Sequence, residues 1–204
     1  MRFPRLLRPP APARVEHVVV GLGNPGDGYA PTRHNVGFRV VSRLARRARA
    51  DFDHRAASSR IAEGRVGAVP VAIARPQTFM NDSGAAVRKL LDRYRVGPGA
   101  LLVISDDIDL PLGRIRIRAS GGAGTHNGMR SVVAAVGEGF ARIRCGVAPA
   151  DPGAPILGEL ADFVLAPFAA AEREQAEAMV LRAAEAAEVA LRDGVARAME
   201  RFNG

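Results

Sequence analysis

The chain has 204 residues, of which 48% are hydrophobic and 25% charged, so it is long enough for one large domain with a sizeable core. No apolar run reaches the roughly 18 residues that a membrane-spanning helix needs, so we expect no such helix. The formal net charge is +8, and such an excess favours a polyanionic partner. Lys89 is the only lysine, so arginine carries the charge, and its planar guanidinium binds phosphate with two parallel hydrogen bonds.

The N-terminal segment 1–14 is basic and interrupted by prolines, and no apolar segment typical of a signal peptide follows it. This composition predicts a short flexible arm, with residues 15–204 forming a single domain. Cys145 is the only cysteine, which excludes an internal disulfide and suits the reducing cytoplasm. A lone thiol can act as a nucleophile, but Cys145 lies in an alternating apolar stretch, and we expect it to be a buried structural residue.

The first half of the chain alternates apolar runs typical of strands with segments of helical periodicity. Residues 16–22 form a β-branched run that ends at glycines. Residues 66–74 form a second run, in which Pro70 indicates an edge strand or a bulge. Residues 35–48 and 81–94 carry apolar side chains at helical spacing and are predicted to be helices.

The second half of the chain continues this alternation. Further strands are predicted at 100–105, 114–118 and 142–147, and further helices at 129–136 and 169–193, with a short terminal helix after Gly194. Strands that alternate with helices predict an α/β fold: one domain with a largely parallel sheet and helices on both faces. No internal repeat or linker divides the chain.

A GxGxxG pattern occupies residues 21–26, directly after the first predicted strand. Taken alone, this pattern suggests dinucleotide binding, which needs a helix that opens at its third glycine. Here residues 23–31, rich in Gly, Pro and Asp, form a loop that delays the helix to about Asn35. We therefore favour the other use of such a turn, which directs the Asn24 side chain into a cleft at the edge of the sheet.

His34 and a group of aspartates are the candidates for proton transfer. His34 ends the loop just before a helix, and histidine is the side chain whose ordinary pKa lies near neutrality. Asp106, Asp107 and Asp109 follow an apolar strand, where α/β proteins place their sites. One of these acids could hold a histidine in the tautomer of a general base. A magnesium site of clustered carboxylates is the alternative, although no phosphate-binding GK[ST] motif accompanies it.

Three asparagines lie in loops or at helix starts, at positions 24, 81 and 127. Carboxamides offer a donor and an acceptor without charge, so they suit a peptide-like group or a developing oxyanion. Each one alone is more typical of a cap or a turn. Together with His34 and Asp106 they indicate a hydrolytic site without a side-chain nucleophile. None of the four histidines has the spacing of a zinc site, so no metal is predicted.

Four motifs in order carry a resemblance to a known family. They are GLGNPGDGYAPTRHNVGF at 21–38, PQTFMNDSG at 76–84, DDIDLPLGRIRIR at 106–118 and GGAGTHNGMRSV at 121–132. Together they closely resemble the bacterial peptidyl-tRNA hydrolases. The resemblance covers about residues 16–150, and each motif contains several specific residues.

The resemblance implies a cytoplasmic, monomeric enzyme without metal or cofactor, built on a twisted mixed sheet flanked by helices. Such enzymes hydrolyse the ester that joins a peptide to tRNA, and they have no covalent intermediate. At the matching positions, His34 is the expected general base and Asp106 the group that orients it and the water. The expected substrate-binding residues are Asn24, Phe79, Met80, Asn81 and Asn127, and the expected tRNA-binding residues are Arg116, Arg118 and Arg144.

One departure from the family's pattern lies in the glycine-rich loop. Thr125 stands where glycine or serine is usual, and it is expected to stiffen that loop. The alternative function is a non-catalytic RNA-binding protein on the same scaffold. Because His34, Asp106 and the three asparagines are all present, the sequence favours the enzyme.

Overall fold

The computed structural model describes residues 14–151, 154–156 and 158–203. The arm predicted for residues 1–14 lies outside these residues, apart from Arg14. Seven strands form one sheet: β1 (His17–Gly21), β2 (His54–Ala56), β3 (Ser59–Val66), β4 (Val69–Pro76), β5 (Leu101–Pro111), β6 (Ile115–Arg118) and β7 (Ala141–Ala148). The α-helices are α1 (Val36–Arg47), α2 (Ser83–Tyr94), α3 (Asn127–Val136), α4 (Leu160–Leu165), α5 (Arg173–Asp193) and α6 (Val195–Phe202). Four 3₁₀ turns are η1 (Arg33–Asn35), η2 (Met80–Asp82), η3 (Pro98–Ala100) and η4 (Ala170–Glu172).

The sheet is mixed, with a parallel centre and antiparallel margins. Its order is β2-β3-β4-β1-β5-β7-β6. The four central strands, β4, β1, β5 and β7, run parallel, whereas β2, β3 and β6 pair antiparallel with their neighbours. The carboxyl ends of the four parallel strands therefore lie along one edge, and this edge positions the site.

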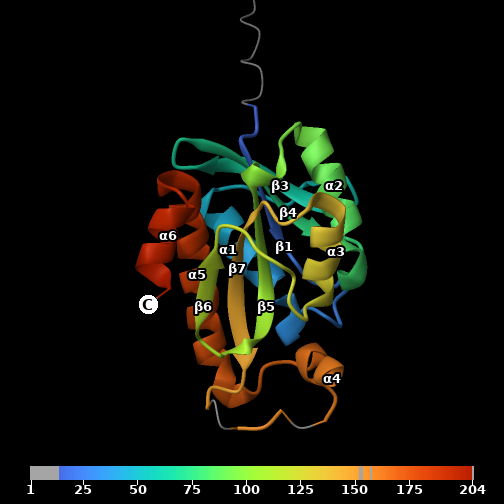
Figure 1. Cartoon of the computed structure of the whole chain (residues 1–204), viewed down its shortest axis with the longest axis vertical. Helices are drawn as coiled ribbons and strands as arrows, with labels where there is room; N and C mark the ends of the chain where they lie inside the picture. Colours follow the sequence, from blue (N-terminus) through green and yellow to red (C-terminus); the bar gives the residue numbers. More distant parts are fainter. Residues whose placement is uncertain (1–13, 152–153, 157, 204) are drawn as a thin grey trace, which may run out of the picture.

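Helices cover both faces of the sheet, as predicted. Figure 1 shows α2 and α3 on one side of the strands, with α5 and α6 on the other. Val18 and Val20 of β1 belong to the core beneath α2 and α3, and Val19 belongs to the core beneath α1 and α5. Because β1 is buried on both faces, its sequence is a continuous apolar run and not an alternating one. Among the described residues, no helix combines the length and the apolarity needed to cross a bilayer.

The prediction that Pro70 marks an edge strand or a bulge is wrong. β4 lies between β3 and β1, and its pairing with β3 is regular from Val69 to Pro76. Pro70 is the second residue of β4, immediately after the hairpin turn from β3. At the start of a strand, a missing N–H costs little in the hydrogen-bond ladder.

Four other elements, β2, β3, β5 and α4, differ from the prediction. The strand predicted to end at residue 105 continues to Pro111, so Asp106 and Asp107 lie within β5 and not after it. The pairing of β5 with β7 becomes irregular between Asp107 and Pro111, as is common beside active sites. β2, β3 and α4 were not predicted as separate elements.

Candidate active site

A cavity of about 690 Å³ opens at the carboxyl ends of the parallel strands. The loop after β1, the segment after β4 and the end of β5 supply residues to it, and β7 supplies Arg144 from its middle. α4 lies beyond these strand ends and forms part of the wall (Figure 1). The cavity contains all of the predicted catalytic and substrate-binding residues: Asn24, His34, Phe79, Met80, Asn81, Asp106 and Asn127.

His34 and Asp106 form a direct hydrogen bond although 72 residues separate them in the sequence. Nδ1 of His34 lies 2.8 Å from Oδ2 of Asp106. Two glycines allow this approach, because η1 and α1 pack directly on β1 and β5. A Cβ on Gly21 would lie 2.3 Å from the carbonyl oxygen of Gly37, and a Cβ on Gly37 would lie 2.5 Å from that of Ile104. The first glycine of the GxGxxG pattern is therefore explained by helix packing, and α1 begins only at Val36.

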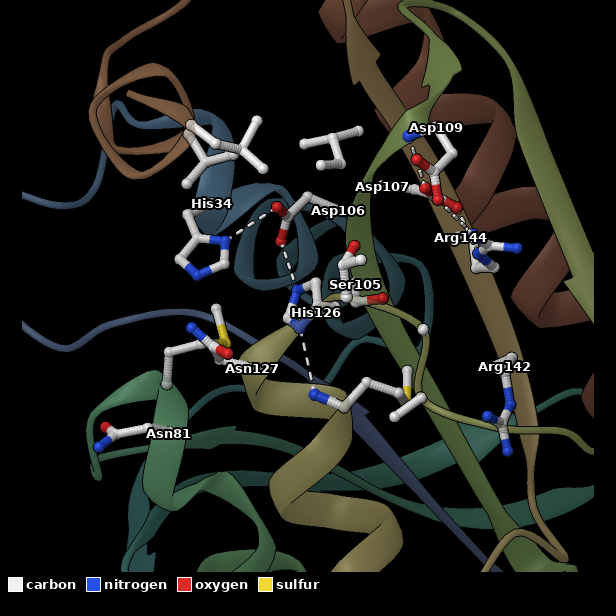
Figure 2. A pocket seen from close by; sticks show the side chains of 18 of the residues that line it. His34, Asn81, Ser105, Asp106, Asp107, Asp109, His126, Asn127, Arg142 and Arg144 are labelled. Carbon is white, nitrogen blue, oxygen red and sulfur yellow. Dashed lines mark hydrogen bonds and ion pairs between the residues drawn. The ribbon is translucent and has the colours of Figure 1, made fainter. Parts of the chain in front are cut away.

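The hydrogen bond fixes the tautomer of His34. The pKa of Asp106 is held well below its usual value, because hydrogen bonds and charge from the two neighbouring imidazoles outweigh burial, which alone would raise it. A carboxylate only accepts, so Nδ1–H of His34 is the donor. The lone pair of Nε2 is then directed away from Asp106 (Figure 2), which is the arrangement of a general base.

Two histidines contact Asp106, and the contact from His126 was not predicted. Nε2 of His126 lies 2.8 Å from Oδ1 of Asp106, so each carboxylate oxygen holds one imidazole (Figure 2). His126 also caps α3, since its Nδ1 accepts the backbone N–H of Met129 at 3.1 Å. Both of its ring nitrogens are therefore occupied. The sequence signal was weak, because histidine is not a typical N-cap residue and nothing local shows the approach of Asp106.

Arg33 is a further residue that sequence reasoning missed. It is buried next to His34, and its guanidinium donates to the carboxylate of Glu172 at 2.6 Å and to the carbonyl of Pro167. The same group lies 4.5 Å from the ring centre of Phe163. Arg33 thus connects η1, which carries His34, to the segment that contains α4. This role could not be predicted, because nothing in the local sequence distinguishes Arg33 from the many other arginines of the chain.

The Asn24 side chain is held in one orientation. Its Oδ1 accepts the backbone N–H of Met80 at 2.8 Å. The Asn35 side chain in turn holds the Asn24 backbone, accepting its N–H at 2.8 Å and donating to its carbonyl at 2.9 Å. Because Oδ1 of Asn24 is occupied, its Nδ2 remains as the donor for a ligand in the cavity.

Asn81 and Asn127 lie at the starts of neighbouring elements, η2 and α3, and both are exposed at the cavity (Figure 2). Gly84 allows α2 and α3 to approach, because a Cβ there would lie 2.0 Å from the carbonyl oxygen of Ser131. Phe79 precedes η2 with 58% of its surface exposed, whereas Met80 is buried. The rim of the cavity therefore combines two carboxamides with an exposed aromatic ring.

The three arginines predicted to bind tRNA differ in their surroundings. Arg116 and Arg118 lie on the exposed face of β6, and no ion pair involves either among the described residues. Arg118 lines the cavity, but Arg116 does not. Arg144 instead forms an ion pair with Asp107 and lies 3.6 Å from the carboxylate of Asp109. Its charge is thus largely compensated within the protein.

His34, Asp106 and His126 are also the one group in the described residues with the composition of a small metal site, their ligand atoms lying within 4.8 Å of one another. The shortest separations, however, are 2.8 Å between nitrogen and oxygen, which is a hydrogen-bond distance. A metal ion would have to displace both bridging protons. The geometry therefore favours a hydrogen-bonded triad.

Cys145 is buried on β7, as predicted. Burial raises the pKa of its thiol, and the nearby Asp106 and Asp107 raise it further. The thiolate needed for nucleophilic attack is therefore disfavoured. Cys145 is a structural residue of the core.

Comparisons with known proteins point to one family. Residues 18–204 match the family described as peptidyl-tRNA hydrolase. A peptidyl-tRNA hydrolase from Roseiflexus castenholzii is 49% identical over 188 residues, which cover 91% of this chain and 86% of the relative. One from Alkaliphilus oremlandii is 41% identical, covering 92% and 100%. The crystal structure of the Acinetobacter baumannii peptidyl-tRNA hydrolase superposes with a TM-score of 0.84 at 31% identity, covering 92% and 94%.

Proposed function

This chain belongs to the peptidyl-tRNA hydrolase family, and we propose that it hydrolyses the ester bond of peptidyl-tRNA with water that His34 activates. The observation that supports this mechanism is the pairing of Nδ1 of His34 with Asp106 at 2.8 Å, in a cavity that also contains three carboxamides. The products are free tRNA and a peptide with a free carboxylate. No covalent intermediate is required.

The first step is attack of water on the ester carbonyl. Nε2 of His34 accepts a proton from the water as its oxygen bonds to the carbonyl carbon, and the carbonyl oxygen becomes an oxyanion. The imidazolium that forms is stabilised by the Asp106 carboxylate, which stays ionised because of its lowered pKa. General-base assistance of this kind contributes about 10²–10⁴-fold to the rate.

The second step is collapse of the tetrahedral intermediate. The bond to the ribose oxygen breaks, and His34 returns its proton to that oxygen. Nδ2 of Asn24 supplies a fixed donor for the substrate carbonyl, since its other amide atom is occupied by Met80. Asn81 and Asn127 offer further donors at the rim. One lost donor of an oxyanion costs about 10²–10³-fold.

The remaining contacts divide the substrate between two surfaces. Phe79 and Met80 offer an apolar surface to the peptide. Arg116 and Arg118 present free guanidinium groups to the tRNA phosphates, and Arg144 on β7 contributes a third guanidinium group. Arginine–phosphate contacts release counterions, so binding weakens as salt increases. The proposal includes a monomeric, cytoplasmic enzyme that needs no cofactor.

A hydrolysis assay tests the proposed function. Purified protein is incubated with N-acetyl-aminoacyl-tRNA, and the release of free tRNA is measured alongside tRNA binding. We expect multiple turnovers in the presence of EDTA. Binding of tRNA without ester cleavage would contradict the proposal and would favour a non-catalytic RNA-binding protein.

A further inference from the structure

A second pocket of about 350 Å³ adjoins the catalytic cavity at the loop that contains Asn24. Asn24 lines both. Five arginines line the second pocket, and we call it the arginine pocket: Arg39, Arg43 and Arg46 from α1, Arg60 from β3 and Arg75 from β4. Two carboxylates, those of Asp27 and Glu177, also line it. The pocket therefore has an excess of positive charge.

Two of these arginines are side by side because of strand register. Arg60 at the start of β3 pairs directly with Arg75 near the end of β4. The Nε atoms of both are buried without a hydrogen-bond partner. Burial lowers the pKa of Arg75, and the neighbouring charge of Arg60 lowers it further. Like charges held together in this way are stabilised by an anion between them.

The arginines from α1 are only partly compensated. Arg39 and Arg43 both donate to the one carboxylate of Glu177, Arg39 at 3.0 Å. Arg46 is exposed, and no ion pair involves it in the part of the chain that the structure describes. The lining charges that remain free are sufficient for one or two phosphate groups.

The catalytic cavity differs, since its arginines are largely occupied. Arg144 is paired with Asp107, and the guanidinium of Arg142 donates to the carbonyls of Gly122, Glu138 and Phe140. Only Arg118 among its arginines is free of such contacts in the described residues. Much of the free cationic charge next to the ester-cleaving residues thus lies in the arginine pocket.

We propose that the arginine pocket binds the phosphodiester groups of the single-stranded acceptor end of the tRNA. This inference rests on the proposed function, because the nucleotides closest to the scissile ester must lie beside Asn24. A concave pocket of this size admits an extended strand but excludes a duplex. Phe38 in its lining offers an aromatic surface for a base, and arginine planes also stack on bases.

A binding measurement tests the proposal without ester cleavage. The probe is a fluorescein-labelled RNA trinucleotide with the acceptor-end sequence CCA, measured by fluorescence anisotropy with the full chain. Arg60→Gln should weaken binding about tenfold, the loss of one hydrogen bond to a charged group. Arg46→Gln, at an exposed position that cannot disturb the core, should weaken it about threefold and reduce the salt dependence by about one phosphate contact.

The matched control is Arg65→Gln, which lies on the same strand as Arg60 but at the hairpin end, where it contacts the Ala68 carbonyl. We expect this variant to bind the trinucleotide as the wild type does. Equal affinity of the Arg46 and Arg60 variants and the wild type would overturn the inference. The inference would also be overturned if the pocket bound inorganic phosphate with the same dependence on these arginines but did not bind the trinucleotide.

Turnover separates this inference from the proposed function. With N-acetyl-aminoacyl-tRNA, Arg60→Gln should raise KM and leave kcat unchanged, as loss of uniform binding does. A wild-type protein that binds the trinucleotide but cleaves no ester would contradict the proposed function alone. A wild-type protein that cleaves the ester, with variants of unchanged KM, would contradict only the inference.

Discussion

His34 in η1 and His126 at the N-cap of α3 present their imidazoles to the two oxygens of one carboxylate, that of Asp106. The two distances to Asp106 are the same, 2.8 Å, although His34 uses Nδ1 and His126 uses Nε2. They differ at the other ring nitrogen. That of His126 accepts a backbone N–H from its own helix, whereas that of His34 has no partner among the described residues. This difference supports the proposal that His34 is the base and that His126 positions Asp106.

Asp106→Asn should have the largest effect, because it breaks both halves of this arrangement. The amide lacks the charge that stabilises the imidazolium. Its NH₂ group is a donor in place of one of the two acceptor oxygens, so only one of the two histidines keeps its acceptor. We expect kcat to fall about 10²–10⁴-fold, with tRNA affinity unchanged. Single-turnover hydrolysis measures the first and filter binding the second. An Asn variant with normal turnover would remove Asp106 from the mechanism.

The same substitution has a predicted effect on stability against pH. The pKa of Asp106 is lower in the folded protein than in the unfolded chain. Its stabilising contribution is therefore present above the unfolded pKa, about 4, and is lost as the pH falls toward the folded pKa. Urea unfolding should show that the advantage of the wild type over Asp106→Asn shrinks as the pH falls below about 4. An advantage that grew in that range would contradict the lowered pKa.

Asn24→Asp tests the donor that Asn24 offers to the substrate in the cavity that contains His34. The new carboxylate still accepts the Met80 N–H, so the loop should keep its position. It cannot donate, and it adds negative charge where an oxyanion forms. We expect kcat to fall about 10²-fold. A circular dichroism melt provides the control for folding, and a variant with wild-type kcat would show that Nδ2 of Asn24 does not contact the reacting ester.

His126→Asn separates the two roles of that residue. Asparagine caps helices well, so α3 should remain intact, but the shorter side chain loses the contact with Asp106. We expect a decrease in kcat of about tenfold, the loss of one hydrogen bond to a charged group, with KM unchanged. Because His126 acts through Asp106, the pH profile of kcat should also shift. An unshifted profile would indicate a purely structural role.

Arg118→Ala should have the smallest effect, confined to binding. Its guanidinium is exposed on β6, and such contacts are worth little individually. We expect KM to rise about two- to fivefold, with kcat unchanged and the dependence on salt reduced. A salt dependence equal to that of the wild type would exclude this face of β6 from the tRNA surface.

The sequence was sufficient to predict the fold class, and the residues that the four motifs predicted as catalytic or substrate-binding all line one cavity. It was not sufficient for the contacts that depend on register or on distant segments. His126 was missed because its partner lies on β5, 20 residues away in the sequence. Arg60 and Arg75 come together through the pairing of β3 with β4, and β3 itself was not predicted. The prediction for Pro70 was wrong because, in the sequence, a proline at the start of a central strand cannot be distinguished from a proline in an edge strand.

The most direct test of the mechanism compares His34→Ala with His126→Asn in single-turnover hydrolysis of N-acetyl-aminoacyl-tRNA. Both residues contact Asp106, but only His34 has a nitrogen available to water. We predict that His34→Ala lowers the rate at least about tenfold more than His126→Asn does, while both bind tRNA normally. Equal losses, or a larger loss in the His126 variant, would contradict the assignment of His34 as the base.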